Sequence, residues 1–173
     1  MYDHDRVHEL LPQRYPMLLI DRVERVEPGR SIVAVKAVTA GEPCYRHIPD
    51  GAGLDAYAYP ASLLLESLGQ AAALIWLTGQ GPVGTGHVLM FAAARGFRMT
   101  GAAYPGDVLR HEVELTQEKA GTLFATGHTY ATGRPIAAVD SIIAVRRAQS
   151  VLTETATNRS ATSSSATSRE AVT

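Results

Sequence analysis

Cysteine is almost absent from this chain, and neither sign of charge predominates. Among its 173 residues, Cys44 is the single cysteine, so no disulfide can form within the chain and a reducing compartment is expected. Sixteen Lys and Arg residues stand against seventeen Asp and Glu, which gives a formal net charge of -1. Because nucleic-acid-binding domains usually carry a basic excess, we expect no nucleic-acid partner.

The chain also lacks a long uninterrupted apolar run. Residues 63–77 are strongly apolar, but Glu66 and Gln70 interrupt them. A membrane-spanning helix needs about 20 mostly apolar residues, so this stretch predicts a buried helix and no membrane span. The first residues read MYDHDR and are not followed by the apolar stretch of a secretory signal, so we expect a cytoplasmic protein.

Apolar residues are scarce at the end of the chain. Residues 148–173 are almost all Ser, Thr and Ala, with two Val, one Leu and no aromatic residue. Such a segment buries too little apolar surface to offset its ordering entropy, so we predict a disordered tail. A solvated terminus is favoured over a docking or regulatory segment. The folded domain is predicted to span residues 1–147.

What the chain does contain is one strong helical pattern among several strand-like runs. The helix is predicted over residues 60–78, opened by Pro60 and ended by Gly79 and Gly81. It is apolar nearly all round, which is typical of a buried helix. A short helix is predicted at residues 7–11, and strands at residues 18–27, 31–38, 87–94, 96–100, 108–118, 122–130 and 135–146.

Short turns connect several of these strands. Pro28-Gly29, Ala120-Gly121 and Thr132-Gly133 are turn signals, and short turns imply antiparallel pairing. The central helix is the one element long enough to cover the apolar face of the sheet. We therefore predict an α+β hotdog fold, in which an antiparallel sheet of about five or six strands wraps around one long central helix.

Three stretches resemble one enzyme family. Residues 11–23 read LPQRYPMLLIDRV, where that family typically has LPHRYPFLLVDRV, so Gln13 stands in place of His. Residues 38–49 (VTAGEPCYRHIP) and 59–72 (YPASLLLESLGQAA) resemble its NEP, GHFPG, MPG and EAMAQ segments. Residues 97–99 (FRM) and 104–107 (YPGD) resemble its RFR and VPGD. The family is that of the FabZ-type 3-hydroxyacyl-[acyl carrier protein] dehydratases, and the resemblance covers residues 9–147.

This resemblance implies a lyase that dehydrates a 3-hydroxyacyl thioester to the trans-2-enoyl thioester in fatty acid or polyketide biosynthesis. It implies acyl carrier protein as partner, with the substrate on its 4′-phosphopantetheine arm and no further cofactor. It also implies a homodimer with active sites at the subunit interface. The catalytic His of the family maps to His47, its catalytic Glu to Glu66 of the other subunit, and a glycine five residues earlier to Ala61.

The residue types suit this chemistry. Imidazole titrates near neutrality, so His47 is the predicted base. Burial favours the uncharged form of a carboxyl, and Glu66 lies in an apolar helix, so it is the predicted acid. Ala61 begins the helix, where a backbone N–H is available to stabilise a developing oxyanion. Gln70 lies four residues after Glu66 on the same helix face and is predicted to orient the carboxyl.

Other candidate sites are weaker. Arg95 and Arg98 are candidate contacts for the acidic carrier protein, with ordinary surface arginines an equal alternative. The five histidines other than His47 show no metal-ligand spacing, so no metal site is expected. Cys44 lies near His47, where a thiol nucleophile is one alternative. A small buried residue that fills the family's aromatic position is the favoured one.

The sequence departs from the family around His47. Arg46 replaces a glycine, Ile48 a phenylalanine and Asp50 a glycine, while residues 51–56 are an insertion before Glu66. Three alternatives follow: a specialised dehydratase with a reshaped substrate tunnel, a non-catalytic or partner-dependent subunit of a heterodimer, and a hotdog thioesterase. The first is favoured because both chemical residues are retained.

Overall fold

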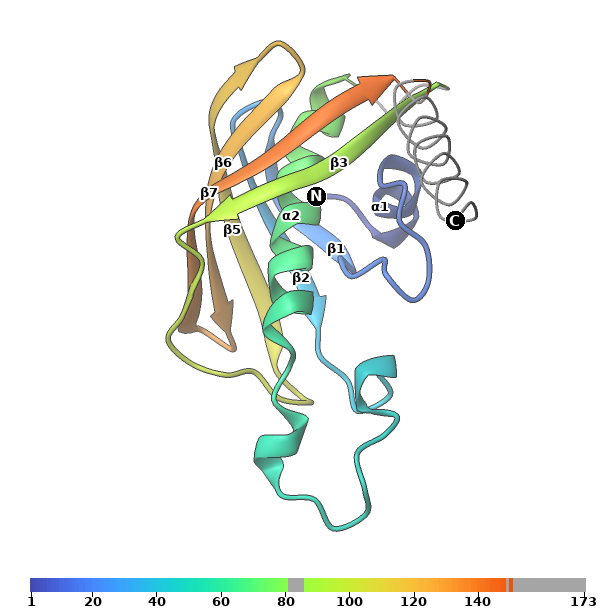
Figure 1. Cartoon of the computed structure of the whole chain (residues 1–173), viewed down its shortest axis with the longest axis vertical. Helices are drawn as coiled ribbons and strands as arrows, with labels where there is room; N and C mark the ends of the chain where they lie inside the picture. Colours follow the sequence, from blue (N-terminus) through green and yellow to red (C-terminus); the bar gives the residue numbers. More distant parts are fainter. Residues whose placement is uncertain (81–85, 149, 151–173) are drawn as a thin grey trace, which may run out of the picture.

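The computed structural model of the chain describes residues 1–80, 86–148 and 150 (Figure 1). The helical elements are α1 (His4–Leu10), η1 (Pro43–Tyr45), η2 (Leu54–Tyr57) and α2 (Ala61–Gln80), η1 and η2 being short 3₁₀ turns. The strands are β1 (Arg22–Glu27), β2 (Ser31–Ala37), β3 (His87–Arg95), β4 (Arg98–Met99), β5 (Val108–Lys119), β6 (Thr122–Ala131) and β7 (Arg134–Ala148).

The strands form one antiparallel sheet that wraps around α2, as Figure 1 shows. The strand order is β1-β2-β5-β6-β7-β3, and β4 pairs with β7 beside β3. The predicted α+β hotdog fold is confirmed. In the described part of the chain the sheet has seven strands, against the predicted five or six, because β4 forms a separate two-residue pairing.

The hairpin turns lie where the sequence predicts them. Ala120 and Gly121 have φ of 49° and 70°, and Thr132 and Gly133 have φ of 47° and 83°. Two-residue turns with positive φ at both positions twist in the same sense as the strands that they join, so β5, β6 and β7 follow one another as neighbours. The turn at Pro28-Gly29 likewise joins β1 to β2.

Element ends differ from the predicted ones for identifiable reasons. Strand β1 begins at Arg22 and not at Leu18, because the N–H of Leu19 bonds to a side chain of α2. Helix α2 continues to Gln80 and includes Gly79, which a helix tolerates at a cost of about 1 kcal/mol. Gly81 lies outside the described residues. Pro60 precedes the helix, and its carbonyl accepts the Leu64 N–H at 3.0 Å.

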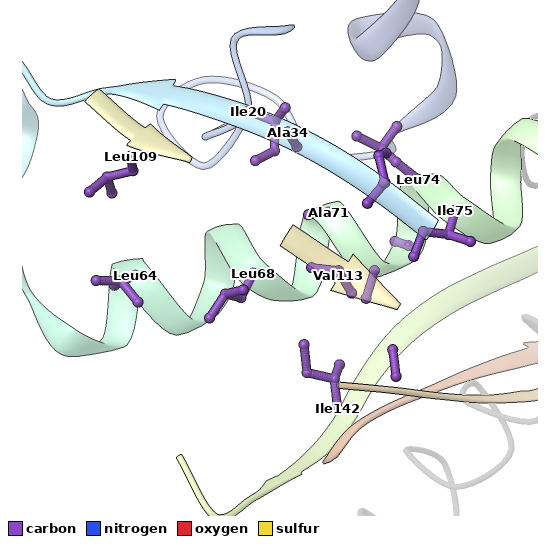
Figure 2. Close-up of a cluster of buried hydrophobic side chains, with 14 of the residues drawn as sticks. Ile20, Ala34, Leu64, Leu68, Ala71, Leu74, Ile75, Leu109, Val113 and Ile142 are labelled. Carbon is purple, nitrogen blue, oxygen red and sulfur yellow. The ribbon is translucent and has the colours of Figure 1, made fainter. Parts of the chain in front are cut away.

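Helix α2 is buried on several sides, as its all-round apolar pattern predicts. Figure 2 shows its side chains between β2 and β5 on one side and β7 on the other. The fully buried residues labelled there include Leu64, Leu68, Ala71, Leu74 and Ile75 of α2, together with Ala34, Leu109, Val113 and Ile142 of the strands. Because this one helix supplies much of the core, any side chain on it is held by the packing of the whole domain.

The segment Leu54–Gln80 is long and apolar enough to cross a membrane by length and composition, with a mean hydropathy of 1.3. Within the fold, however, 67% of its most apolar stretch is buried against the sheet. Burial in the core therefore accounts for its hydropathy without a membrane. The last strand ends at Ala148, one residue past the predicted domain end. The predicted tail, except residues 148 and 150, lies outside the described residues.

A buried histidine ties α2 to the sheet. His111 of β5 is fully buried, with Nε2 2.9 Å from Ser67 Oγ of α2 and Nδ1 2.9 Å from Thr129 Oγ1 of β6. Ser67 Oγ also donates to the Leu64 carbonyl, so it accepts from His111 Nε2–H, and the Thr129 hydroxyl donates to Nδ1. Burial, with a smaller contribution from the Lys36 charge, lowers the pKa of His111 to about 3. The ring is therefore neutral in the folded protein.

This histidine makes the stability depend on pH. An unfolded histidine titrates near pH 6.5 and folded His111 near 3, so between these values the unfolded state binds one more proton. The free energy of unfolding should therefore fall as the pH is lowered, by roughly 2 kcal/mol from pH 6.5 to pH 5 for this group. Urea unfolding at several pH values measures it. His111→Gln should flatten this dependence and His128→Gln, at an exposed position, should not; equal slopes in all three proteins would contradict the assignment.

Candidate active site

Glu66 lies in the second turn of α2 and is half-buried. Its carboxyl faces a small pocket between α2, the segment that follows α1, and the strands β3 and β7. The other lining residues are Pro12, Gln13, Gly69, Ala73, Leu89, Phe91 and Ala144. Apart from Gln13 this lining is apolar, and its volume of about 20 Å³ is that of a single water molecule, so one chain alone does not accommodate an acyl group here.

Gln70 holds the Glu66 carboxyl and is itself held. Its Nε2 donates to Glu66 Oε1 at 2.9 Å and to the Met17 carbonyl at 2.7 Å, and its Oε1 accepts the Leu19 N–H at 2.9 Å. The side chain is 1% exposed. Since both ends of the amide are bonded to backbone groups, its orientation is fixed. The predicted contact between Gln70 and Glu66 is present; its role in catalysis stays a prediction.

Gln13 is a neighbour of Glu66 that the sequence analysis did not assign to the site. Its Nε2 lies 3.4 Å from Glu66 Oε1, across 53 positions of sequence. The sequence feature that points to Gln13 is its place in the LPQRYP stretch, where the FabZ-type family has His. A contact this distant along the chain depends on how residues 11–20 fold over α2, which the local pattern does not give.

His47 lies apart from Glu66 within the single chain. It follows η1 in the segment between β2 and α2, and its side chain is exposed. Figure 1 shows this segment projecting beyond the end of the sheet. Among the described residues, no hydrogen bond joins His47 to Glu66, and His47 does not line the pocket around the carboxyl. One chain thus does not bring the predicted acid and base together.

A buried ion pair anchors the segment that carries His47. Lys36 Nζ of β2 lies 2.6 Å from Glu42 Oε1, just before η1, and the two side chains are 6% and 12% exposed. The same Nζ donates to the Ala37 carbonyl at 3.1 Å and lies 5.5 Å from the ring centroid of Tyr59, just before α2. One cation therefore contacts both ends of the projecting segment.

Comparison with known proteins identifies the family to which the chain belongs. A family model described as FabA-like domain matches residues 11–140, which include Gln13, His47, Glu66 and Gln70. The chain belongs to the FabA-like family.

Two curated relatives bear the name 3-hydroxyacyl-[acyl-carrier-protein] dehydratase FabZ. The protein of Zymomonas mobilis is 41% identical over 119 residues, which is 68% of this chain and 72% of the relative. That of Symbiobacterium thermophilum is 39% identical over 123 residues, which is 70% of this chain and 82% of the relative. Both alignments cover more than two-thirds of each protein.

Solved structures share the fold at low sequence identity. The dehydratase heterocomplex ApeI:P from Xenorhabdus doucetiae matches with a TM-score of 0.69 and 17% identity over 86% of this chain and 95% of that one. A thioesterase superfamily member from Thermus thermophilus matches with a TM-score of 0.60 and 15% identity over 83% and 98%. Dehydratases and thioesterases thus share this fold, so the fold does not decide between the two reactions.

In this FabA-like domain, Ala61 is the first residue of α2 and is exposed. The first N–H groups of a helix have no carbonyl one turn earlier to which they could donate. Its N–H is therefore available at the positive end of the helix, and the replacement of glycine by alanine leaves this donor intact. The role as oxyanion donor stays a prediction.

The two arginines predicted to face the carrier protein are both exposed. Arg98 donates from its two terminal nitrogens to Asp140 at 2.7 and 2.6 Å, and this contact lowers the pKa of the Asp140 carboxyl. Much of its charge is therefore already balanced by a carboxylate. Arg95 ends β3, and no salt bridge involves it in the described part of the chain. The carrier-protein role of both residues stays a prediction.

The favoured interpretation of Cys44 as a buried residue is wrong, because η1 turns its side chain outward and it is exposed. Partial desolvation, with the negative charge of Glu42, raises the pKa of its thiol. A thiol with a raised pKa is a poor nucleophile at neutral pH. Within residues 1–80 and 86–148, no cluster of three or more His, Cys, Asp or Glu side chains is placed to hold a metal ion.

The anchor of the His47 segment can be tested by stability measurements. Lys36→Met should lower the free energy of unfolding by about 3 kcal/mol, because Glu42 is left buried without its partner. The double variant Lys36→Met/Glu42→Leu should recover a large part of this loss. Urea unfolding measures both, with Arg30→Met at the exposed pair with Glu27 as a control that changes little. A double variant as unstable as the single one would contradict the interpretation.

Proposed function

We propose that this chain removes water from a 3-hydroxyacyl thioester carried on acyl carrier protein and so forms the trans-2-enoyl thioester. The observation that carries the proposal is the carboxyl of Glu66, held by Gln70 in a small apolar pocket of a FabA-like domain. The FabZ names of the relatives support the same reaction. A FabZ-type substrate arrives on the 4′-phosphopantetheine arm, and the proposed reaction uses no other cofactor.

The proposed reaction balances with two protein groups. The imidazole of His47 removes the proton from C2, which is acidified by the thioester carbonyl. The C3–O bond breaks, its electron pair leaves with the oxygen, and the carboxyl of Glu66 donates a proton to form water. The C2–H electron pair becomes the C2=C3 double bond. A positioned acid and base of this kind typically contribute 10²–10⁴-fold each to the rate.

Negative charge develops on the thioester oxygen as the C2 proton leaves. The Ala61 N–H, at the N-terminus of α2 and five residues before Glu66, is the proposed donor to that oxygen. A backbone donor of this type contributes about 3–4 kcal/mol in acyl-transfer enzymes. Gln70 fixes the rotamer of Glu66. Because Glu66 and Ala61 belong to one rigid helix, the carboxyl is thereby held relative to the Ala61 N–H.

The active site is proposed to form between two copies of the chain. The side chain of His47 is exposed and does not line the Glu66 pocket, so it needs a second chain to complete the site. Strand β3 is an edge of the sheet, and its sequence HVLMFAAAR is largely apolar. An exposed apolar edge strand is a template for pairing with another chain. Pairing through β3 in a two-fold dimer is the proposed arrangement.

The proposal also extends to the cellular compartment and pathway, the contact with the carrier protein and the partner subunit. The protein is proposed to act in the cytoplasm, in fatty acid or polyketide biosynthesis. Arg95 is the favoured contact for the acidic carrier protein, because Asp140 already balances Arg98. A second hotdog subunit could take the place of the second copy, as the name of the ApeI:P dehydratase heterocomplex says of that protein.

The reaction can be tested with the purified chain and 3-hydroxyacyl carrier protein. Mass spectrometry should show loss of one water per acyl group, and His47→Ala or Glu66→Ala should abolish it with the thermal midpoint retained. Release of free acid would instead identify a thioesterase. Absence of reaction on several chain lengths would reject the stand-alone enzyme and leave the partner-dependent subunit.

Shared active sites can be tested by mixing two inactive variants. If each site takes His47 from one copy and Glu66 from the other, mixed dimers of His47→Ala and Glu66→Gln contain one intact site. Unfolding and refolding an equal mixture should then restore about a quarter of the wild-type activity, since half of the dimers are mixed and each has one of two sites. No recovery in a mixture that forms dimers would place both residues in the same chain.

A further inference from the structure

Gln13 is incompletely bonded beside Glu66. Its Oε1 is buried and has no hydrogen-bond partner among the described residues. Its Nε2 is 3.4 Å from Glu66 Oε1, a long contact to an oxygen that already accepts from Gln70 at 2.9 Å. The Gln13 N–H group thus donates to an oxygen that Gln70 already bonds at a shorter distance, whereas the Gln13 Oε1 acceptor has no partner. A buried acceptor without a partner is unfavourable. We therefore expect this orientation of the Gln13 amide in one state of the active site and not in every state.

The two amides beside Glu66 differ in their freedom to turn. The Met17 carbonyl and the Leu19 N–H fix the orientation of Gln70, so it can offer Glu66 nothing but a donor. Among the described residues, the Gln13 amide has no such backbone bond, while Arg14 donates to the carbonyls of Leu11 and Gln13 and holds the backbone at this position. A half-turn of an amide exchanges oxygen and nitrogen at nearly constant shape. That turn would direct Gln13 Oε1 at the Glu66 carboxyl.

We propose that Gln13 is a positioning residue whose Oε1 accepts the O–H of protonated Glu66 and so holds this carboxyl in its acid form for the dehydration step. The proposal rests on the proposed function, in which Glu66 is the acid. Gln70 donates to the carboxyl in both of its states. Gln13 distinguishes between them, because a protonated carboxyl has a proton to donate and an ionised one has none.

Nothing else in the pocket competes for this role. The lining from the segment after α1, from α2, β3 and β7 contains no titratable side chain other than Glu66 in the described part of the chain. The nearby cation of Arg14 is engaged with two backbone carbonyls. Among the described lining residues, Gln13 therefore has the one side chain able to accept a hydrogen bond from the protonated Glu66 carboxyl.

The first test compares pH profiles of kcat. Gln13→Met keeps the side-chain length but has neither a strong donor nor a strong acceptor. It should displace the basic limb of the profile to lower pH, so that kcat on that limb falls several-fold with KM within about twofold. Gln13→His, which restores an acceptor, should recover most of the activity. Gln117→Met, at an exposed position of β5, is the matched control. An unchanged profile for Gln13→Met would overturn the proposal.

A second test needs no turnover. The ¹³C signal of the Glu66 carboxyl, assigned by its loss in Glu66→Gln, reports protonation directly. Its titration midpoint should be lower in Gln13→Met than in the wild type and should return toward the wild-type value in Gln13→His. Equal midpoints would overturn the role of Gln13 whether or not the chain dehydrates. Shifted midpoints in a protein without dehydratase activity would retain the contact and reject the proposed function.

Discussion

The arrangement of the site depends on one buried amide. Gln70 is bonded to the backbone at Met17 and Leu19 and to the carboxyl of Glu66, so it joins the segment after α1 to the central helix. Without it, the Leu19 N–H and the Met17 carbonyl would lose these partners beside an apolar helix, which is costly. The same bonds explain why β1 begins only at Arg22. A residue that serves the proposed chemistry is thus also part of the packing of the fold.

The central helix combines two demands that conflict. An apolar helix is the natural core of a curled sheet, yet it must also present a carboxyl group. In the structure, Glu66 of α2 lines a small pocket, while the next residue, Ser67, bonds to buried His111 on a different face of the helix. Because Ser67 and Gln70 both have hydrogen-bond partners, they fix the rotation of the helix without leaving a buried charge. The direction of Glu66 follows from that rotation.

Much of the fold could be predicted from the sequence because its signals are local. The turns at Ala120-Gly121 and Thr132-Gly133, the apolar helix and the contact between Gln70 and Glu66 each depend on residues a few positions apart. The contact of Gln13 with Glu66 and the pair of Lys36 with Glu42 and Tyr59 depend on how loops fold over other elements. The exposure of Cys44 depends likewise on the 3₁₀ turn in which it lies. Patterns of hydrophobicity carry no information about such contacts.

The residues that differ from the family pattern are unevenly distributed over the structure. Their location bears on whether the substrate or the reaction has changed. Arg46, Ile48 and Asp50 lie in the projecting segment around His47, as does the insertion at residues 51–56, whereas Glu66, Gln70 and the anchor of Lys36 to Glu42 lie in or against the packed domain. Loops tolerate substitution because few buried contacts depend on them, and they commonly set specificity on a rigid scaffold. A chain that had lost its chemistry would have no reason to retain the costly half-buried carboxyl of Glu66 and its neighbour Gln70. This distribution favours an altered substrate over a lost reaction.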